Sequence, residues 1–128
     1  MIILDTSFVI DYARGKDAKL TTLIMRRPVA ICGIVRAELL YGARDAAHRS
    51  HLLTILAVFT QISMPESIWN VVGDHLAALR RHGLTVPLLD AVIATLGIVN
   101  DLEVWTRDPH FPQMQPILPR LRLFQEPP

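Results

Sequence analysis

Short apolar runs alternate with segments of helical periodicity along the chain, and this alternation restricts the fold more than any other feature. We predict strands at the apolar runs, over residues 2–4, 29–31, 60–64, 102–106 and 121–124. Parallel strands need long crossover connections, which helices normally supply. The alternation therefore predicts an α/β protein with a short parallel sheet between layers of helices.

The helix boundaries follow from capping residues and helix breakers. Thr6 or Ser7 is predicted to cap a first helix that runs to residue 12, and Asp17 a second that runs to residue 25. Residues 34–41 and 46–59 are predicted to form two more helices.

Two later helices are also predicted. Residues 63–66 (SMPE) have the spacing of a capping box, so a helix is predicted to begin there, run to His82 and stop at Gly83. The strongly apolar segment 88–99 is predicted to form a central helix. Its small residues recur at spacings of three and would allow close packing: Ala91, Ala94 and Gly97.

Composition restricts the class of protein. A chain of 128 residues fits one domain, 1–128, and 51% hydrophobic residues supply enough core to exclude a disordered chain. The single Cys32 cannot form an internal disulfide, and the apolar runs fall short of the roughly 20 residues that cross a bilayer. We expect a cytoplasmic protein with no membrane contact. The net charge of +1 gives no overall field that would indicate a polyanion partner.

Four acidic residues stand in apolar surroundings, where an ionised carboxylate is costly. Asp5 and Asp108 follow predicted strands, and the carboxyl ends of parallel strands form the binding crevice of an open sheet. Glu38 and Asp90 could project to the same place from helices. Taken singly, each acid also fits an ordinary helix cap, exposed helical position or turn.

If the four acids converge, each pair at about 4 Å repels by roughly 4 kcal/mol at an effective dielectric near 20, and a cation would relieve the repulsion. Oxygen ligands favour Mg²⁺ or Mn²⁺, and no cysteine and histidine spacing indicates zinc. A metal-activated water could then attack a phosphodiester.

Such a pocket alone fits several functions. It would equally suit a DNA nuclease or a phosphatase. A phosphoryl-accepting receiver is disfavoured, because no lysine follows Lys19. A non-catalytic module whose pocket binds a partner's arginine also stays open.

Four segments between residues 5 and 111 resemble, in order, the motifs of PIN-domain ribonucleases, in particular VapC toxins of toxin–antitoxin pairs: DTSFVIDY, RAELLYG, LLDAVIATL and TRDPHF. The resemblance implies a three-layer α/β/α fold, an RNA substrate, a homodimer and inhibition by a cognate antitoxin. It also implies that the catalytic, metal-binding acids are Asp5, Glu38, Asp90 and Asp108. Thr6 and Thr106 match positions that support such a site by hydrogen bonding. A housekeeping nuclease stays open as an alternative.

Basic residues next to the acids are candidates for RNA contact. Arg107 and His110 flank Asp108, and we expect them to touch RNA. The cluster at residues 80–82 is better explained as a complement to the helix dipole. The remaining histidines, His48, His51 and His75, show no convincing metal spacing and are expected to be surface or hydrogen-bonded residues.

Overall fold

The computed structural model describes residues 1–126 and contains one five-stranded sheet in the order β3-β2-β1-β4-β5. All four neighbouring pairs are parallel. The strands are β1 Ile2–Leu4, β2 Val29–Cys32, β3 Thr60–Ile62, β4 Glu103–Trp105 and β5 Arg122–Leu123. The helices are α1 Thr6–Ala13, α2 Ala18–Arg26, α3 Gly33–Tyr41, α4 Ala46–Leu56, α5 Ile68–Arg81, α6 Leu88–Val99 and α7 His110–Met114.

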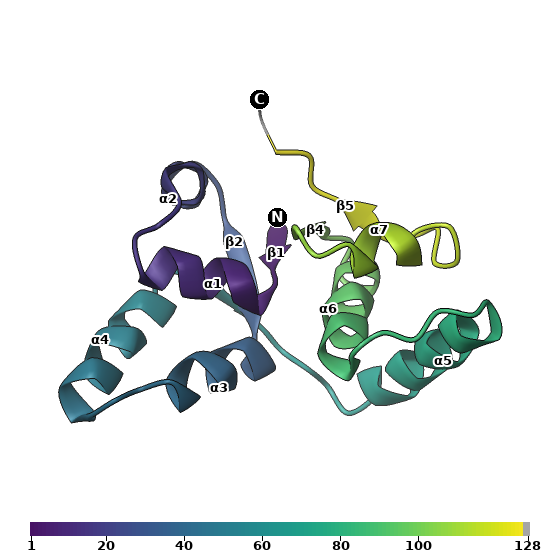
Figure 1. Cartoon of the computed structure of the whole chain (residues 1–128), viewed down its shortest axis with the longest axis horizontal. Coiled ribbons are helices and arrows are strands. Elements are labelled where there is room, and N and C mark those ends of the chain that lie inside the picture. The colour runs from purple at the N-terminus through teal and green to yellow at the C-terminus, as the bar shows by residue number, and fades with distance from the viewer. Residues whose placement is uncertain (127–128) are drawn as a thin grey trace.

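The helices form a layer on each side of the sheet. The chain moves outward from β1 to β2 and β3, then returns past β1 to add β4 and β5. Because crossovers between parallel strands are right-handed, this reversal moves the connecting helices to the opposite face. Figure 1 shows α1 to α4 together on one side of the strands and α5, α6 and α7 on the other. The predicted α/β/α architecture with a parallel sheet is confirmed.

The reversal places the ends of β1 and β4 side by side. Leu4, the last residue of β1, pairs with Trp105, the last residue of β4. The residues that follow, Asp5 and Thr106, therefore leave the sheet at one point of its edge. In open parallel sheets, ligands bind at such a switch point, outside the carboxyl ends of the strands.

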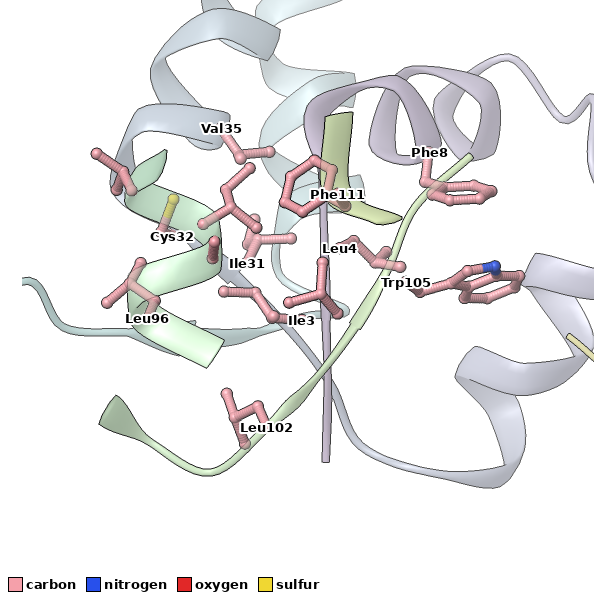
Figure 2. Packing of buried hydrophobic residues seen from close by; sticks show 14 of the residues in the cluster. Ile3, Leu4, Phe8, Ile31, Cys32, Val35, Leu96, Leu102, Trp105 and Phe111 are labelled. Carbon is pink, nitrogen blue, oxygen red and sulfur yellow. The ribbon is translucent and has the colours of Figure 1, made fainter. Parts of the chain in front are cut away.

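Apolar side chains on both faces fix these two strands. On one face, Leu4 and Trp105 are fully buried, and Phe8 of α1 packs on Trp105 with ring centroids 4.7 Å apart. On the other face, the paired Ile3 and Val104 lie beneath α6. Figure 2 shows Phe8 beside Trp105 and, across β1, Ile3 toward the helix that carries Leu96. Burial on both faces explains why β1 is a continuous apolar run, whereas β4 has one polar residue, the half-buried Glu103, at its start.

Helix α6 is the most buried helix of the described chain. Its residues 91–97 are all buried, as a central helix requires. Among residues 1–126, no helix combines the length and the apolar composition needed to cross a bilayer, and the longest, α5, has 14 residues.

Two predicted helix starts were wrong. Asp5, not Thr6 or Ser7, caps α1, because its side chain reaches the backbone N–H of Phe8 at 3.3 Å. Helix α5 begins at Ile68 instead of near residue 64. The preceding residues close turns of the i→i+3 type, such as the 3.0 Å bond from the Ile68 N–H to the Pro65 carbonyl. The predicted end of this helix is confirmed, since Gly83 has φ +80 directly after the cap His82.

Two predicted boundaries near other helices also needed correction. Helix α4 ends at Leu56 and not at Phe59, because the N–H groups of Val58 and Phe59 bind carbonyls three residues back instead of four. The segment 107–111 was predicted as a loop, but α7 begins within it, at His110.

The contact between Gly97 and β4 gives a test of the packing. A Cβ atom at Gly97 would lie 2.8 Å from Val104 Cγ2 and 3.2 Å from the Leu102 carbonyl oxygen. We expect Gly97→Ala to lower the free energy of unfolding by about 1–3 kcal/mol, as overpacking does. Gly73→Ala in α5 is the matched control: a Cβ there meets nothing within 4 Å, so helix propensity should raise stability by up to about 1 kcal/mol. Urea unfolding measures both, and equal stability of the two variants would contradict the packing.

Candidate metal centre

Asp5 is held from both sides of the switch point. Its Oδ1 accepts hydrogen bonds from the Ser7 hydroxyl at 2.7 Å and the Phe8 N–H at 3.3 Å. Its Oδ2 accepts a bond from the Thr106 hydroxyl at 2.7 Å. The residue is only 7% exposed. These neutral donors orient the carboxylate and satisfy its oxygens without cancelling its charge.

Thr106 connects the two acids that follow strands. Its Oγ1 donates to Asp5 Oδ2 and accepts a bond from the Asp108 N–H at 2.9 Å. Asp108 Oδ1 in turn accepts the His110 N–H at 2.9 Å, which closes a tight turn at the start of α7. Thr106 was expected from the resemblance to support the acids, and in the structure it bonds to one acid and fixes the backbone of another.

Asp90 lies in the first turn of α6 and reaches the same place. Asp90, Asp108 and His110 each offer one ligand atom, and these atoms lie within 4.8 Å of one another. His110 Nδ1 is 3.2 Å from Asp90 Oδ2 and 2.9 Å from Asp108 Oδ1. Asp90 and Asp108, 18 positions apart along the chain, are thus brought together. We call the group formed by Asp5, Asp90, Asp108 and His110 the acidic cluster.

Two buried atoms of the acidic cluster lack a hydrogen-bond partner among the described residues. Asp90 Oδ2 and His110 Nδ1 are buried, and neither has a hydrogen-bond partner within residues 1–126. Although the two atoms are close, the alignment that a hydrogen bond requires is not reached. A buried polar atom without a partner is costly. A metal ion at this position would give Asp90 Oδ2 the partner that it lacks in the described chain.

Electrostatics indicate the same need for positive charge. Burial raises the pKa of Asp90, and the nearby Asp108 and Asp5 carboxylates raise it further. His110 acts in the opposite direction, which is not sufficient to cancel the other effects. The side chain of Asp90 is 13% exposed, so water screens this repulsion poorly. Residues 1–126 therefore gather negative charge here, and no lysine or arginine among them forms an ion pair with these acids.

Glu38 stands beside the acidic cluster rather than within it. Its Oε1 accepts a 3.0 Å hydrogen bond from the Thr6 hydroxyl, and Thr6 is the residue after Asp5. Glu38 is exposed on α3 and does not belong to the group of three ligands within 4.8 Å. Thr6, which the resemblance implied as a supporting residue, therefore links Glu38 to the end of β1.

Arg107 and His110 differ in their surroundings. Arg107 forms ion pairs with Asp17 at 3.0 Å and Glu126 at 2.7 Å, and its guanidinium lies 4.9 Å from the centre of the Phe8 ring. These contacts give Arg107 a structural role, since they join the start of α2 to the end of the described chain. RNA contact by either residue stays a prediction.

The sequence interpretation missed the place of His110 in the acidic cluster. The available signal was its position two residues after Asp108, where a tight turn brings the two side chains together. The other histidines are less informative for a metal site. His75 Nδ1 lies 2.8 Å from the Thr95 hydroxyl, and burial lowers its pKa. His48 Nδ1 accepts a hydrogen bond from the Arg44 backbone N–H.

Known proteins share both the sequence pattern and the fold. A family model described as PIN domain matches residues 2–115. "Ribonuclease VapC10" of Mycobacterium tuberculosis is 32% identical over 123 residues, which cover 93% of this chain and 92% of that protein. The structure of VapBC2 from Rickettsia felis, bound to a DNA fragment from their promoter, matches with a TM-score of 0.81 and 23% identity over 97% of this chain and 98% of that chain. DNA-bound VapBC from Salmonella typhimurium matches with a TM-score of 0.80 and 22% identity over 96% of each chain. The chain therefore belongs to the PIN domain family, among its VapC-type members.

Proposed function

We propose that the chain is a metal-dependent endoribonuclease that acts as the toxin of a type II toxin–antitoxin pair. One observation carries the proposal: the buried Asp90 Oδ2, without a hydrogen-bond partner in residues 1–126, faces Asp108 at the switch point between β1 and β4. The relative named as a ribonuclease, 32% identical over nearly the whole chain, supports RNA as the substrate.

The metal is proposed to be Mg²⁺ or Mn²⁺. Carboxylate oxygens are the ligands that these hard ions prefer, and the acidic cluster offers them from three separate elements. When bound, such an ion supplies an activated water and offsets negative charge on the phosphate. Asp5, Asp90 and Asp108 are the proposed ligands, and Glu38 is the proposed outer acid at the exposed edge of the site.

The surrounding residues hold these acids in position. Thr106 fixes one oxygen of Asp5 and the backbone of Asp108, and Ser7 fixes the other Asp5 oxygen. Thr6 orients Glu38. Such outer partners are typically worth 10- to 100-fold in metal affinity or activity, because they fix the direction of the ligand oxygens. His110 is proposed to stay close to the phosphate that is cleaved.

The cellular setting is part of the proposal. Solved structures with the same fold include a toxin–antitoxin complex from Klebsiella pneumoniae and a member of the VapBC family of toxin–antitoxin systems, which supports a cognate antitoxin for this chain. We further propose a single PIN domain that forms a homodimer and acts in the cytoplasm, where its RNA substrate would be found. The buried, unpaired Cys32 is compatible with that reducing compartment.

Loss of an acid should abolish cleavage. We expect Asp5→Asn and Asp90→Asn each to lower Mn²⁺-dependent RNA cleavage by more than about 100-fold, because direct ligands should cost more than outer partners do. Gel analysis of a labelled RNA measures the rate. Asp74→Asn removes an equivalent charge from an exposed position of α5 and should cleave like the parent. Unchanged cleavage in both site variants would exclude the assigned acids.

The same assay separates the enzyme from a non-catalytic module. A module that grips a partner's arginine needs no divalent ion, so EDTA would leave its binding unchanged. An enzyme of the proposed kind loses cleavage in EDTA and regains it when Mn²⁺ or Mg²⁺ is added. The absence of any metal-dependent cleavage, with RNA of varied sequence and in the folded parent protein, would contradict the proposed activity.

Thermal stability should report the repulsion directly. In EDTA, Asp90→Asn removes a charge that burial and two carboxylates disfavour, so the melting temperature should rise. A gain of about 1 kcal/mol corresponds to roughly 2–6 °C in a domain of this size. Added Mg²⁺ should raise the melting temperature of the parent more than that of the variant, because ligand binding stabilises the folded state. An equal metal response in the two proteins would count against Asp90 as a ligand.

A further inference from the structure

A polar cleft lies next to Glu38, among residues of α1, α3 and α4. One part, of about 400 Å³, is lined by Ala13, Arg14, Gly42, Arg44, His48 and His51. A second part, of about 170 Å³, shares five of these residues and continues to Glu38. The two parts together form what we call the basic cleft. It connects an acid of the proposed catalytic site to two arginines and two histidines.

The two arginines of the basic cleft carry charge that no carboxylate of the described residues neutralises. Neither Arg14 nor Arg44 forms an ion pair within residues 1–126, and both are exposed. Arg107 and Arg122, in contrast, are each paired with carboxylates. The neighbouring Asp45 does not serve this role, because its carboxylate caps α4 by accepting the His48 N–H at 2.7 Å. The cleft therefore presents positive charge to a ligand.

His48 adds a donor of defined orientation. Its Nδ1 accepts a hydrogen bond from the Arg44 backbone N–H at 3.1 Å. A neutral imidazole that accepts at Nδ1 carries its proton at Nε2, so the ring offers an N–H as its second polar group. His51 follows three residues later on α4 and lines the same cleft, since positions three apart share a helix face.

Tyr41 stands at the edge of the basic cleft. It ends α3, directly before Gly42 and one turn after Glu38, and both of these residues line the cleft. At 93% exposure it is far more accessible than an aromatic side chain needs to be for packing. Proteins bind single-stranded nucleic acid by combining basic side chains that contact phosphates with exposed aromatic rings on which bases stack.

We propose that the basic cleft binds the backbone of single-stranded RNA beside the cleaved bond, with Arg14 and Arg44 on phosphates and Tyr41 stacked on a base. This inference rests on the proposed function, because the RNA enters the cleft from the catalytic acids at its Glu38 end. The cleft then determines where the substrate lies, while the acidic cluster performs the hydrolysis.

The salt dependence of binding tests the arginines. A fluorescein-labelled single-stranded RNA of mixed sequence is titrated with full-length protein in EDTA at several KCl concentrations, and anisotropy gives the affinity. Each phosphate contact in a single strand contributes about 0.7 to the slope of log K against log salt. The Arg14→Gln/Arg44→Gln double variant should therefore have a slope that is smaller by about 1.4, and an affinity about 25-fold lower at 0.1 M KCl.

The Arg80→Gln/Arg81→Gln double variant is the matched control, because it also removes two exposed arginines, from the last turn of α5, outside the cleft. Its slope and affinity should equal those of the parent. Equal slopes in the double variant and the parent would overturn the inference and leave the cleft to a protein partner. Circular dichroism verifies that the exposed substitutions leave the fold intact.

Stacking by Tyr41 has a different signature. Tyr41→Ala should weaken RNA binding by about tenfold and leave the salt slope unchanged, because stacking releases no counterions. Tyr41→Phe keeps the ring and should bind like the parent. A Tyr41→Ala variant with full affinity would remove the stacking contact from the proposal.

Binding and cleavage can fail separately. A parent protein that cleaves RNA with metal, together with an unchanged slope in the double variant, contradicts the basic cleft alone. A parent that binds RNA with the expected slope change, but never cleaves it, supports the cleft and contradicts the proposed activity.

Discussion

The hydrogen bond between Thr106 Oγ1 and Asp5 Oδ2 joins the ends of β1 and β4, where the chain reverses its direction across the sheet. Its geometry depends on apolar packing one residue earlier. Leu4 and Trp105 are paired in register and fully buried, with Phe8 packed on the indole. A carboxylate of this site is thus positioned mainly by side chains that cannot perform chemistry. Changes in that packing should move the acid even though no catalytic residue is altered.

The fold also limits the cost of collecting negative charge. Asp5 caps α1 and Asp90 lies in the first turn of α6, so both carboxylates stand at the positive ends of helix dipoles. This stabilisation is partial, since the pKa of Asp90 is still raised by burial and by its neighbours. Asp5 has donors for both oxygens, whereas Asp90 Oδ2 has none within the described chain. Asp5 is thus an acid whose two oxygens both have donors, whereas Asp90 Oδ2, with His110 Nδ1 3.2 Å away, is the oxygen that we propose as a metal ligand.

The sequence allowed some of these features to be predicted and not others. Apolar runs followed by Asp5 and Asp108 predicted acids at strand ends, because strand periodicity and burial act locally. The relation of Glu38 to Thr6 depends on how α3 packs against α1, which residue spacing cannot determine. His110 reaches Asp90 through a turn closed by a side chain, and such a turn was read as a loop. Likewise, Asp5 rather than Thr6 is the helix cap, because Asp5 Oδ1 accepts the Phe8 N–H while Asp5 Oδ2 accepts the Thr106 hydroxyl.

Neighbouring regions of opposite charge explain how a chain of net charge +1 could bind a polyanion such as RNA. The acidic cluster would repel RNA in the absence of a cation, while Arg14 and Arg44, which form no ion pair within residues 1–126, line the basic cleft that extends to Glu38. Attraction and repulsion then act on neighbouring parts of one strand, and physiological salt weakens each of them over roughly 8–10 Å. Net charge averages these two regions to almost nothing. The local arrangement, and not the total, therefore decides whether such a protein can hold RNA and place one bond at the acids.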